Sequence, residues 1–304
     1  MNNFSNISFK GVVINKKQYA LRVGVITLLL TSMLGLGYLL GSTDTGPSAA
    51  AALAGVVAMM APTPTPVVPV GDPIPLKSLS GLTSLDATVN INVNGMLSDK
   101  RVRGDLTATV STNNKGSSKI VVTGPLLGDI VAQVGGSAMS LFTPSSVEIY
   151  KVPEGTYIVV KSLFDVCIKP KAANSTEAMD QMNPQKLMDM FTSKDVARGT
   201  LAGSETINGA AVKHYVIDGP TFLAAAQNSK DKTLRTFGDS LWAAKDADLY
   251  VSSAGYPVAF QGGYSGLFDP LKFEGDFDVQ IEVTSVNQNT PIKLPASCNN
   301  PISQ

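Results

Sequence analysis

The sequence is poor in histidine and cysteine, two residues that many enzymes use for catalysis. Among its 304 residues it has one histidine, His214, and two cysteines, Cys167 and Cys298. A single histidine in a strand-like pattern does not make a Ser-His-Asp set, and the sequence has no phosphate-binding Gly-Lys-Ser/Thr loop. We therefore predict no enzyme activity, no catalytic residue, no metal site and no cofactor, and we expect His214 to lie on the surface or to face its hairpin.

The chain also has no excess of charge of either sign. Its 24 basic residues balance 24 acidic ones, so it lacks the positive surface that nucleic acid binding requires. The balance is uneven along the chain. Residues 1–43 contain four basic residues and no acidic one, which leaves 20 basic against 24 acidic residues in the remainder, a net charge of −4. We expect no nucleic acid partner.

The longest apolar stretch lies within the 21 uncharged residues between Arg22 and Asp44. It is long enough to span a bilayer, and the basic residues before it are typical of the cytoplasmic side of an anchor. We predict a cytoplasmic leader at 1–22 and a single transmembrane anchor at 23–43, with the rest of the chain outside the cytoplasmic membrane. The alternative is a signal segment cleaved near residue 50, which would give a secreted protein.

Alanine and proline dominate the next segment, 44–76, which we interpret as a linker. Five prolines lie between residues 62 and 73. They preclude a helix and favour an extended, semi-rigid spacer. The linker would hold the following domain, 77–299, away from the membrane, and residues 300–304 would form a short tail.

The segment 77–299 has the period-two alternation of long strands. In Lys272–Thr284 apolar residues and glycine alternate with polar residues throughout, which indicates a half-buried strand about 40 Å long. Asp86–Asn94 alternates in the same way. Asn208-Gly209 is a strong hairpin signal, and short turns of this kind imply antiparallel neighbours. Further strands are predicted at Val102–Ser111, Lys119–Thr123, Val147–Lys151, Thr156–Lys161, Gly199–Ile207, Val212–Asp218, Ala247–Ser252 and Val258–Gly263.

Two or three helices are predicted within this strand pattern. Asn183-Pro184 is an N-cap followed by a proline at the first helical position, Pro220 begins a second helix, and Thr233–Ala244 has helical periodicity. The apolar positions at helical spacing are Leu187, Met190 and Phe191 in the first helix, and Leu234, Phe237 and Leu241 in the third. So few helices can cover only one face of a sheet.

An exported chain with one long antiparallel sheet and a few helices resembles the LolA-like fold, and most closely the LppX/LprG group of envelope lipoproteins. The segments that carry the resemblance span residues 85–295 and read NVNGMLSDKRVRGDLTATV, SSVEIYKVPEGTYIVVK, ARGTLAGSETINGAAVKHYVIDG, DADLYVSSAGYPVAFQGG and FDVQIEVTSVNQNTPIKLP. The resemblance implies an α+β fold, in which a long curved antiparallel β-sheet forms an unclosed half-barrel with a few helices on its concave face. Here an N-terminal transmembrane helix would precede it.

The resemblance also implies an apolar cavity that takes the acyl chains of a lipid or glycolipid. Its candidate lining residues are Phe273, Phe277, Val279, Ile281, Val283, Leu187, Met188, Met190, Phe191, Phe237, Leu241 and Trp242. The methionines suit a lipid gate because they adapt to irregular apolar partners, although such a cluster also occurs in ordinary cores. The chain departs from the family by having no cysteine near residue 40 for a lipid tether. A membrane span would replace the tether, which argues against shuttling between membranes.

The two cysteines lie in the exported part, where we predict that they form a disulfide. The bridge between Cys167 and Cys298 would tie the end of the chain to the middle of the sheet. It would close a loop of about 130 residues, for which chain entropy gives a stabilisation of about 5 kcal/mol. Two buried free thiols are the alternative.

Four carboxylates alternate with the apolar residues of the longest strand: Glu274, Asp276, Asp278 and Glu282. Paired carboxylates can serve as acid and base or bind calcium. Because these four share the side opposite the apolar row with Lys272 and Gln280, we interpret them as a solvated face.

Together, the anchor pattern and the family resemblance imply a membrane-anchored, extracytoplasmic lipid-binding protein that holds acyl chains in an apolar cavity, with lipid transport in the envelope as its expected role. The alternative is a ligand-free structural or sensory module of the envelope that binds a protein partner through an exposed strand edge.

Overall fold

The computed structural model describes residues 71–79, 82–97, 99–129, 144–163, 165–170, 184–268, 273–288 and 290–303. The leader, the anchor predicted at 23–43 and most of the linker lie outside these residues. Within the described part of the chain, no helix combines the length and the apolar character that crossing a membrane requires.

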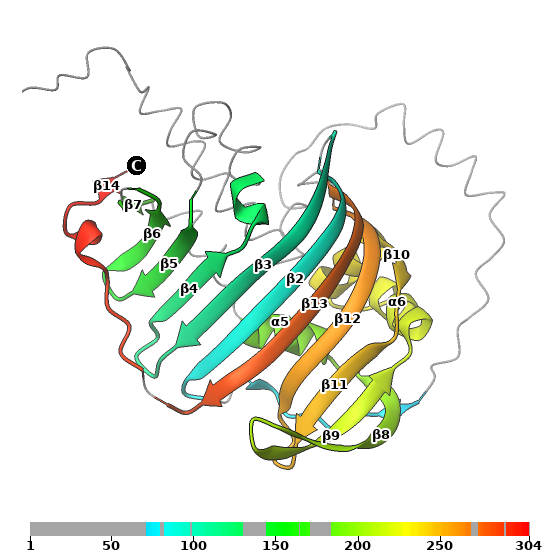
Figure 1. Cartoon of the computed structure of the whole chain (residues 1–304). Coiled ribbons are helices and arrows are strands. Elements are labelled where there is room, and N and C mark those ends of the chain that lie inside the picture. The colour runs from blue at the N-terminus through cyan, green and yellow to red at the C-terminus, as the bar shows by residue number, and fades with distance from the viewer. Residues whose placement is uncertain are drawn as a thin grey trace, which may run out of the picture.

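The described residues form one large, unclosed sheet (Figure 1). Its strands follow the order β1-β8-β9-β11-β12-β13-β2-β3-β4-β5-β6-β7-β14, and β10 also pairs with β12. All pairs are antiparallel except β14 with β7. The strands are β1 (Asp72–Pro73), β2 (Leu85–Leu97), β3 (Lys100–Thr112), β4 (Ser118–Thr123), β5 (Ser146–Val152), β6 (Gly155–Lys161), β7 (Val166–Lys169), β8 (Arg198–Ile207), β9 (Ala210–Ile217), β10 (Leu241–Ala244), β11 (Ala247–Ser252), β12 (Pro257–Phe268), β13 (Phe273–Val286) and β14 (Ile302–Ser303).

The long alternating strand of the sequence is β13, and it occupies the centre of the sheet. It pairs with β12 on one side and with β2 on the other. From Phe277 to Val283 its buried residues recur at every second position, as a strand with one covered face requires. The large antiparallel sheet predicted from the sequence is therefore confirmed, and Figure 1 shows it strongly twisted and curved.

Three helices lie on one side of the sheet: α5 (Pro184–Phe191), α6 (Gly219–Gln227) and α7 (Lys232–Ser240). Asp218 caps α6 by accepting a hydrogen bond from the Thr221 backbone N–H, and Asp231 caps α7 through the Leu234 N–H. The helix predicted over Thr233–Ala244 is too long. The chain becomes extended at Leu241, and β10 pairs with β12, so pairing with the sheet overrides the helical periodicity.

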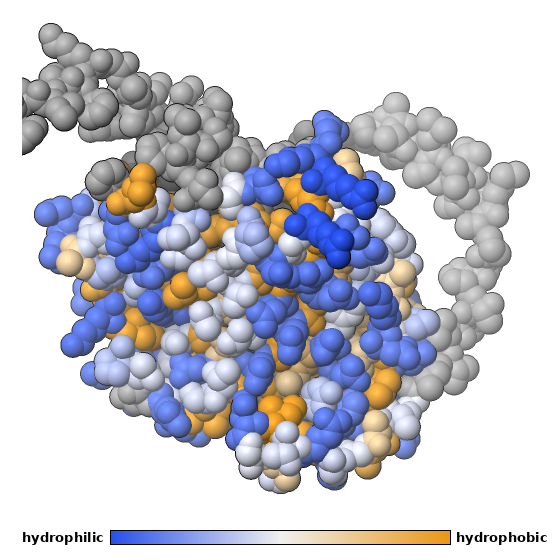
Figure 2. All heavy atoms as spheres, in the orientation of Figure 1, coloured by the Kyte–Doolittle hydropathy of each residue, from blue (hydrophilic) through white to orange (hydrophobic). Residues whose placement is uncertain are grey.

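We call the face that carries Phe260, Ile281 and Val89 the inner face, and the opposite one the outer face. These three residues are direct partners across β12, β13 and β2. The same register row continues through Ala108, Val122 and Val147 on β3, β4 and β5. Figure 2 shows the outer face, where polar side chains dominate.

A second, smaller cluster lies on the outer face at the end of the sheet. It contains Tyr150, Tyr157 and Val159 together with Cys167 and Cys298. The predicted disulfide is confirmed, and it joins β7 to the 3-10 helix η3 (Ala296–Asn299). Its expected position was wrong. β7 lies near one end of the strand order instead of in the middle, because the strands from β2 to β7 pair in chain order and each adds to the same side of the sheet.

Candidate functional site

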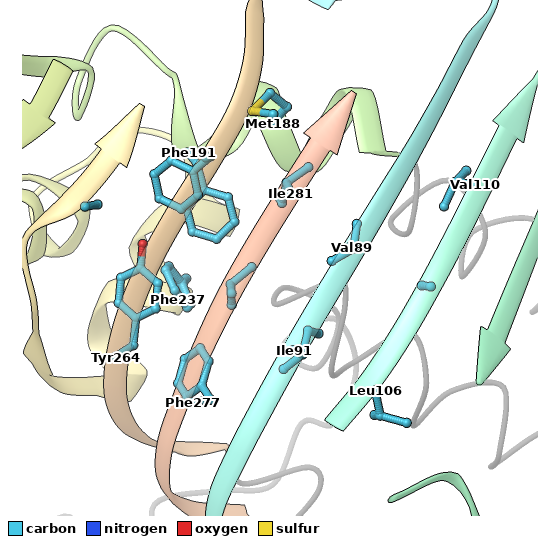
Figure 3. Packing of buried hydrophobic residues seen from close by; sticks show 14 of the residues in the cluster. Val89, Ile91, Leu106, Val110, Met188, Phe191, Phe237, Tyr264, Phe277 and Ile281 are labelled. Atoms are coloured by element: carbon cyan, nitrogen blue, oxygen red, sulfur yellow. The ribbon is translucent and has the colours of Figure 1, made fainter. Parts of the chain in front are cut away.

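Six aromatic rings from five elements meet on the inner face beneath the helices, and Figure 3 labels Phe191, Phe237, Tyr264 and Phe277 among them. The Phe191 ring of α5 stacks on that of Phe260 of β12, with centroids 4.7 Å apart, and meets the Phe237 ring of α7 edge-on at 5.6 Å. Tyr264 of β12 lies 5.4 Å from the Phe277 ring of β13. The sixth ring is that of Phe222 on α6. We call these residues the aromatic cluster, and such pairs stabilise the packing beyond their buried area.

The hydroxyl of Tyr264 is the one polar group of the aromatic cluster. Tyr264 is 1% exposed, and its hydroxyl has no hydrogen-bond partner among the described residues. Burial raises the pKa of Tyr264 far above that of an exposed tyrosine. An unpartnered hydroxyl in such a place costs about 1–3 kcal/mol of stability.

The inner face has a different character on β2 to β5. Every buried side chain that these four strands place on it is aliphatic. They are Leu85, Ala87, Val89, Ile91, Val93, Leu97, Val102, Leu106, Ala108, Val110, Ile120, Val122, Val147 and Ile149. We call this set the aliphatic surface, and Figure 3 shows four of its members, on β2 and β3, beside the aromatic cluster.

Two of the described helices, α6 and α7, lie over the aromatic part, whereas the helical residues 126–129 place Leu126 beside Gly104 of β3. Helix α6 contacts β10, and α7 contacts both β10 and β12. The face is therefore divided. In one part, aromatic rings pack against helices. The other part consists of buried branched aliphatic side chains and alanines on four neighbouring strands. None of its buried side chains is polar, so they offer no group with which to orient a reacting molecule, but they can bury hydrocarbon.

The structure brings most of the candidate cavity residues together. Phe273, Phe277, Val279, Ile281 and Val283 form the inner row of β13 and are buried. The helical candidates Met188, Phe191 and Phe237 are also buried, as is Leu241 of β10, and Met190 is partly buried. Trp242 differs from the others because it is 54% exposed. The side chain of Leu187 lies outside the described part of the structure.

The sole histidine lies on the outer face between two carboxylates that the sequence patterns did not connect with it. His214 Nδ1 is 2.9 Å from Glu205 Oε1, and His214 Nε2 is 2.7 Å from Asp248 Oδ1. Its ring stacks on Tyr250 at 4.6 Å. Burial, and then the charges of Asp248 and Glu205, raise the pKa of Tyr250. The Asn208-Gly209 turn pairs β8 with β9, so the hairpin register could have placed Glu205 near His214, whereas Asp248 comes from a distant segment.

The carboxylates of β13 lie on the outer face with separate partners. Asp278 contacts Lys245 Nζ at 3.2 Å, Asp276 accepts from the Ser265 hydroxyl at 2.6 Å, and Glu282 accepts from the Asn208 amide at 2.9 Å. Glu274 is exposed. In the part of the chain that the structure describes, no group of three His, Cys, Asp or Glu side chains is arranged to hold a metal ion.

Comparison with known proteins gives no match to a family model or to a curated protein. Several solved structures match. The Mycobacterium tuberculosis lipoprotein LppX has 16% identity and a TM-score of 0.35, and the match covers 71% of this chain and 91% of LppX. LprF from Mycobacterium bovis has 14% identity and a TM-score of 0.35, with 71% and 90% covered.

A third solved structure is a putative outer membrane lipoprotein-sorting protein domain from Vibrio parahaemolyticus. It has 8% identity and a TM-score of 0.22, with 71% of this chain and 90% of that domain covered. The matching structures thus include proteins of the group that the sequence patterns resemble.

Proposed function

We propose that this chain is an extracytoplasmic lipid-binding protein that holds acyl chains against the aliphatic surface of β2 to β5. The observation that carries the proposal is the division of the inner face, in which α6 and α7 pack over the aromatic cluster and every buried side chain that β2 to β5 place on this face is aliphatic. Each CH₂ group removed from water contributes about 0.8 kcal/mol. A long acyl chain could therefore bind without any reaction or any charged contact.

The location outside the cytoplasm is supported by the Cys167–Cys298 disulfide, because such bonds persist in oxidising compartments. We further propose that residues 23–43 anchor the chain in the cytoplasmic membrane. The full-length chain should then stay in the membrane pellet after an alkaline carbonate wash. A soluble protein whose mature N-terminus lies near residue 50 would instead show that this segment is a cleaved signal.

Ala108 offers a sharp test of acyl-chain binding. It is 2% exposed and lies in the inner row between Val89 of β2 and Val122 of β4. In the variant Ala108→Phe, the ring would project into the volume above the strand. If lipid occupies that volume, the variant should lose bound lipid and keep its free energy of unfolding. If protein side chains fill it, overpacking should cost about 1–3 kcal/mol.

The control is Thr109→Phe, which adds the same ring to the next residue of β3, where the side chain is exposed on the outer face. This control should retain both lipid and stability. The measurement is native mass spectrometry of the full-length chain purified gently from its host, combined with denaturant unfolding of the delipidated protein. Wild-type protein that carries no lipid, together with a destabilised Ala108→Phe variant, would contradict the proposal.

A further inference from the structure

Tyr264 carries a hydroxyl that the described fold does not use. The ring lies within the aromatic cluster, and a phenylalanine would make the same ring contacts without burying a polar atom. The hydroxyl has neither a protein partner in the described part of the chain nor contact with solvent. Packing alone therefore gives no reason for an oxygen at this place.

The backbone of β12 makes room for this oxygen. Gly262 precedes Tyr264 by two residues on the same face, and a Cβ atom on Gly262 would lie 2.7 Å from the Tyr264 hydroxyl and 3.2 Å from the Phe260 ring. Any side chain at position 262 would displace the hydroxyl. Two positions of one strand thus combine to keep an unpaired donor within an apolar site.

One strand, β13, separates Tyr264 from the aliphatic surface. The Tyr264 ring contacts that of Phe277, and Phe277 pairs directly with Val93 of β2. In Figure 3 the hydroxyl points along β12 toward Phe191 of α5, whose ring centroid is 6.1 Å from that of Tyr264. A ligand that extends from the aliphatic surface toward α5 would meet this donor after displacing the Phe191 ring.

We propose that the Tyr264 hydroxyl donates a hydrogen bond to a carbonyl oxygen of a bound acylated ligand, so that the site prefers ester-linked to ether-linked lipids. This inference rests on the proposed function. An acyl ester supplies a good acceptor next to its hydrocarbon chain, whereas an ether of the same length supplies a weak one. A net hydrogen bond of ordinary strength corresponds to a preference of roughly 2- to 10-fold in affinity.

The test uses the full-length chain in a mild detergent and two probes, dihexadecanoyl-phosphatidylcholine and its diether analogue dihexadecyl-phosphatidylcholine. The rise in Tm with lipid concentration reports the apparent affinity for each probe. Wild-type protein should bind the diester roughly 2- to 10-fold more tightly, and Tyr264→Phe should bind both lipids equally. Without lipid, the Tm of Tyr264→Phe should be unchanged or higher, because the variant buries no hydroxyl.

Thr221→Val is the matched control. Thr221 of α6 also has a buried hydroxyl without a partner among the described residues, and its removal should leave the ester preference intact. The inference is overturned, and the proposed function kept, if wild type and Tyr264→Phe bind both lipids with the same ratio of affinities. If wild-type protein binds neither lipid, the proposed function fails and the inference fails with it.

Discussion

Cys167 of β7 and Cys298 of η3 are joined by a disulfide across 131 residues of sequence, with their Cα atoms 5.1 Å apart. The bond fastens the C-terminal segment to the outer face. Ile292 and Leu294 of this segment pack against the same cluster as the two cysteines. In the folded protein, removal of the bond would detach this segment from the sheet. In the unfolded chain, it would open the loop that the disulfide closes.

We predict that replacing both cysteines by alanine lowers the free energy of unfolding by up to about 5 kcal/mol. This is the stabilisation that the loss of chain entropy in the unfolded state gives for a closed loop of this length. The measurement is the denaturant midpoint of the variant compared with that of wild type. A reductant should lower the midpoint of wild type and leave that of the variant unchanged. Mass spectrometry that finds both cysteines alkylated in unreduced protein from the host would contradict this prediction.

The central strands could be predicted from the sequence because one covered face enforces a period of two. This signal is strong in β13 and β2, which alternate over many residues. It is weak in β7, whose four residues are too few to show a period. It was misleading at Gly263, where the predicted strand ended although β12 continues to Phe268. The strand passes through Gly266, and this position requires a glycine because a Cβ there would come 2.6 Å from the Ser240 carbonyl oxygen.

The candidate site was predictable only in part. The inner row of β13 follows from alternation, and Phe191 and Phe237 follow from helical spacing. Which rings meet cannot be deduced from spacing, because the aromatic cluster joins residues from Phe191 to Phe277 through three helices and two strands. Trp242 shows the reverse case. Its apolar neighbours placed it in a helix, but it lies in β10 and is exposed.

The contact of His214 with two carboxylates predicts a measurable loss of stability when His214 is replaced. His214→Phe keeps a ring that can stack on Tyr250 but removes the two ring nitrogens that contact Glu205 and Asp248. Because the carboxylates are exposed, the expected loss is about 1 kcal/mol, and added salt should reduce it.

The control for His214 is Lys213→Met, which removes a cation from the next residue of β9. Its effect on the free energy of unfolding should stay within about 0.5 kcal/mol. Equal effects of the two variants would mean that the carboxylate contacts of His214 add nothing beyond the cost of replacing a neighbouring polar residue of β9.

Two glycines in different parts of the sheet predict opposite responses from a matched pair of variants. Gly95 of β2 pairs with Gly275 of β13, and a Cβ on Gly95 would lie 2.3 Å from the Glu274 carbonyl oxygen. Gly95→Ala should therefore force the backbones apart and cost about 1–3 kcal/mol. A Cβ on Gly203 of β8 would have no atom of the described residues within 4 Å, and Gly203→Ala should stabilise the protein by about 0.4–1 kcal/mol.

The measurement for the glycine pair is the free energy of unfolding in urea. If Gly95→Ala is as stable as Gly203→Ala, then β2 and β13 do not approach each other as closely as their paired glycines indicate.

The two faces of β13 predict that adjacent substitutions differ strongly. Phe277 is buried beside Tyr264 and opposite Val93, so Phe277→Asp places an unpaired charge among apolar side chains and should cost several kcal/mol. Asp276 is exposed and accepts a hydrogen bond from Ser265. Asp276→Lys removes one surface hydrogen bond and should cost less than about 1 kcal/mol.

Phe277→Leu separates the loss of lipid from the loss of the fold. It keeps position 277 apolar and shortens the side chain, so the delipidated variant should fold with a moderate loss of stability. If acyl chains reach the inner row of β13, bound lipid should fall in Phe277→Leu and stay at the wild-type level in Asp276→Lys, as measured by native mass spectrometry. The same lipid content in both variants would place the ligand away from β13 and confine it to the aliphatic surface of β2 to β5.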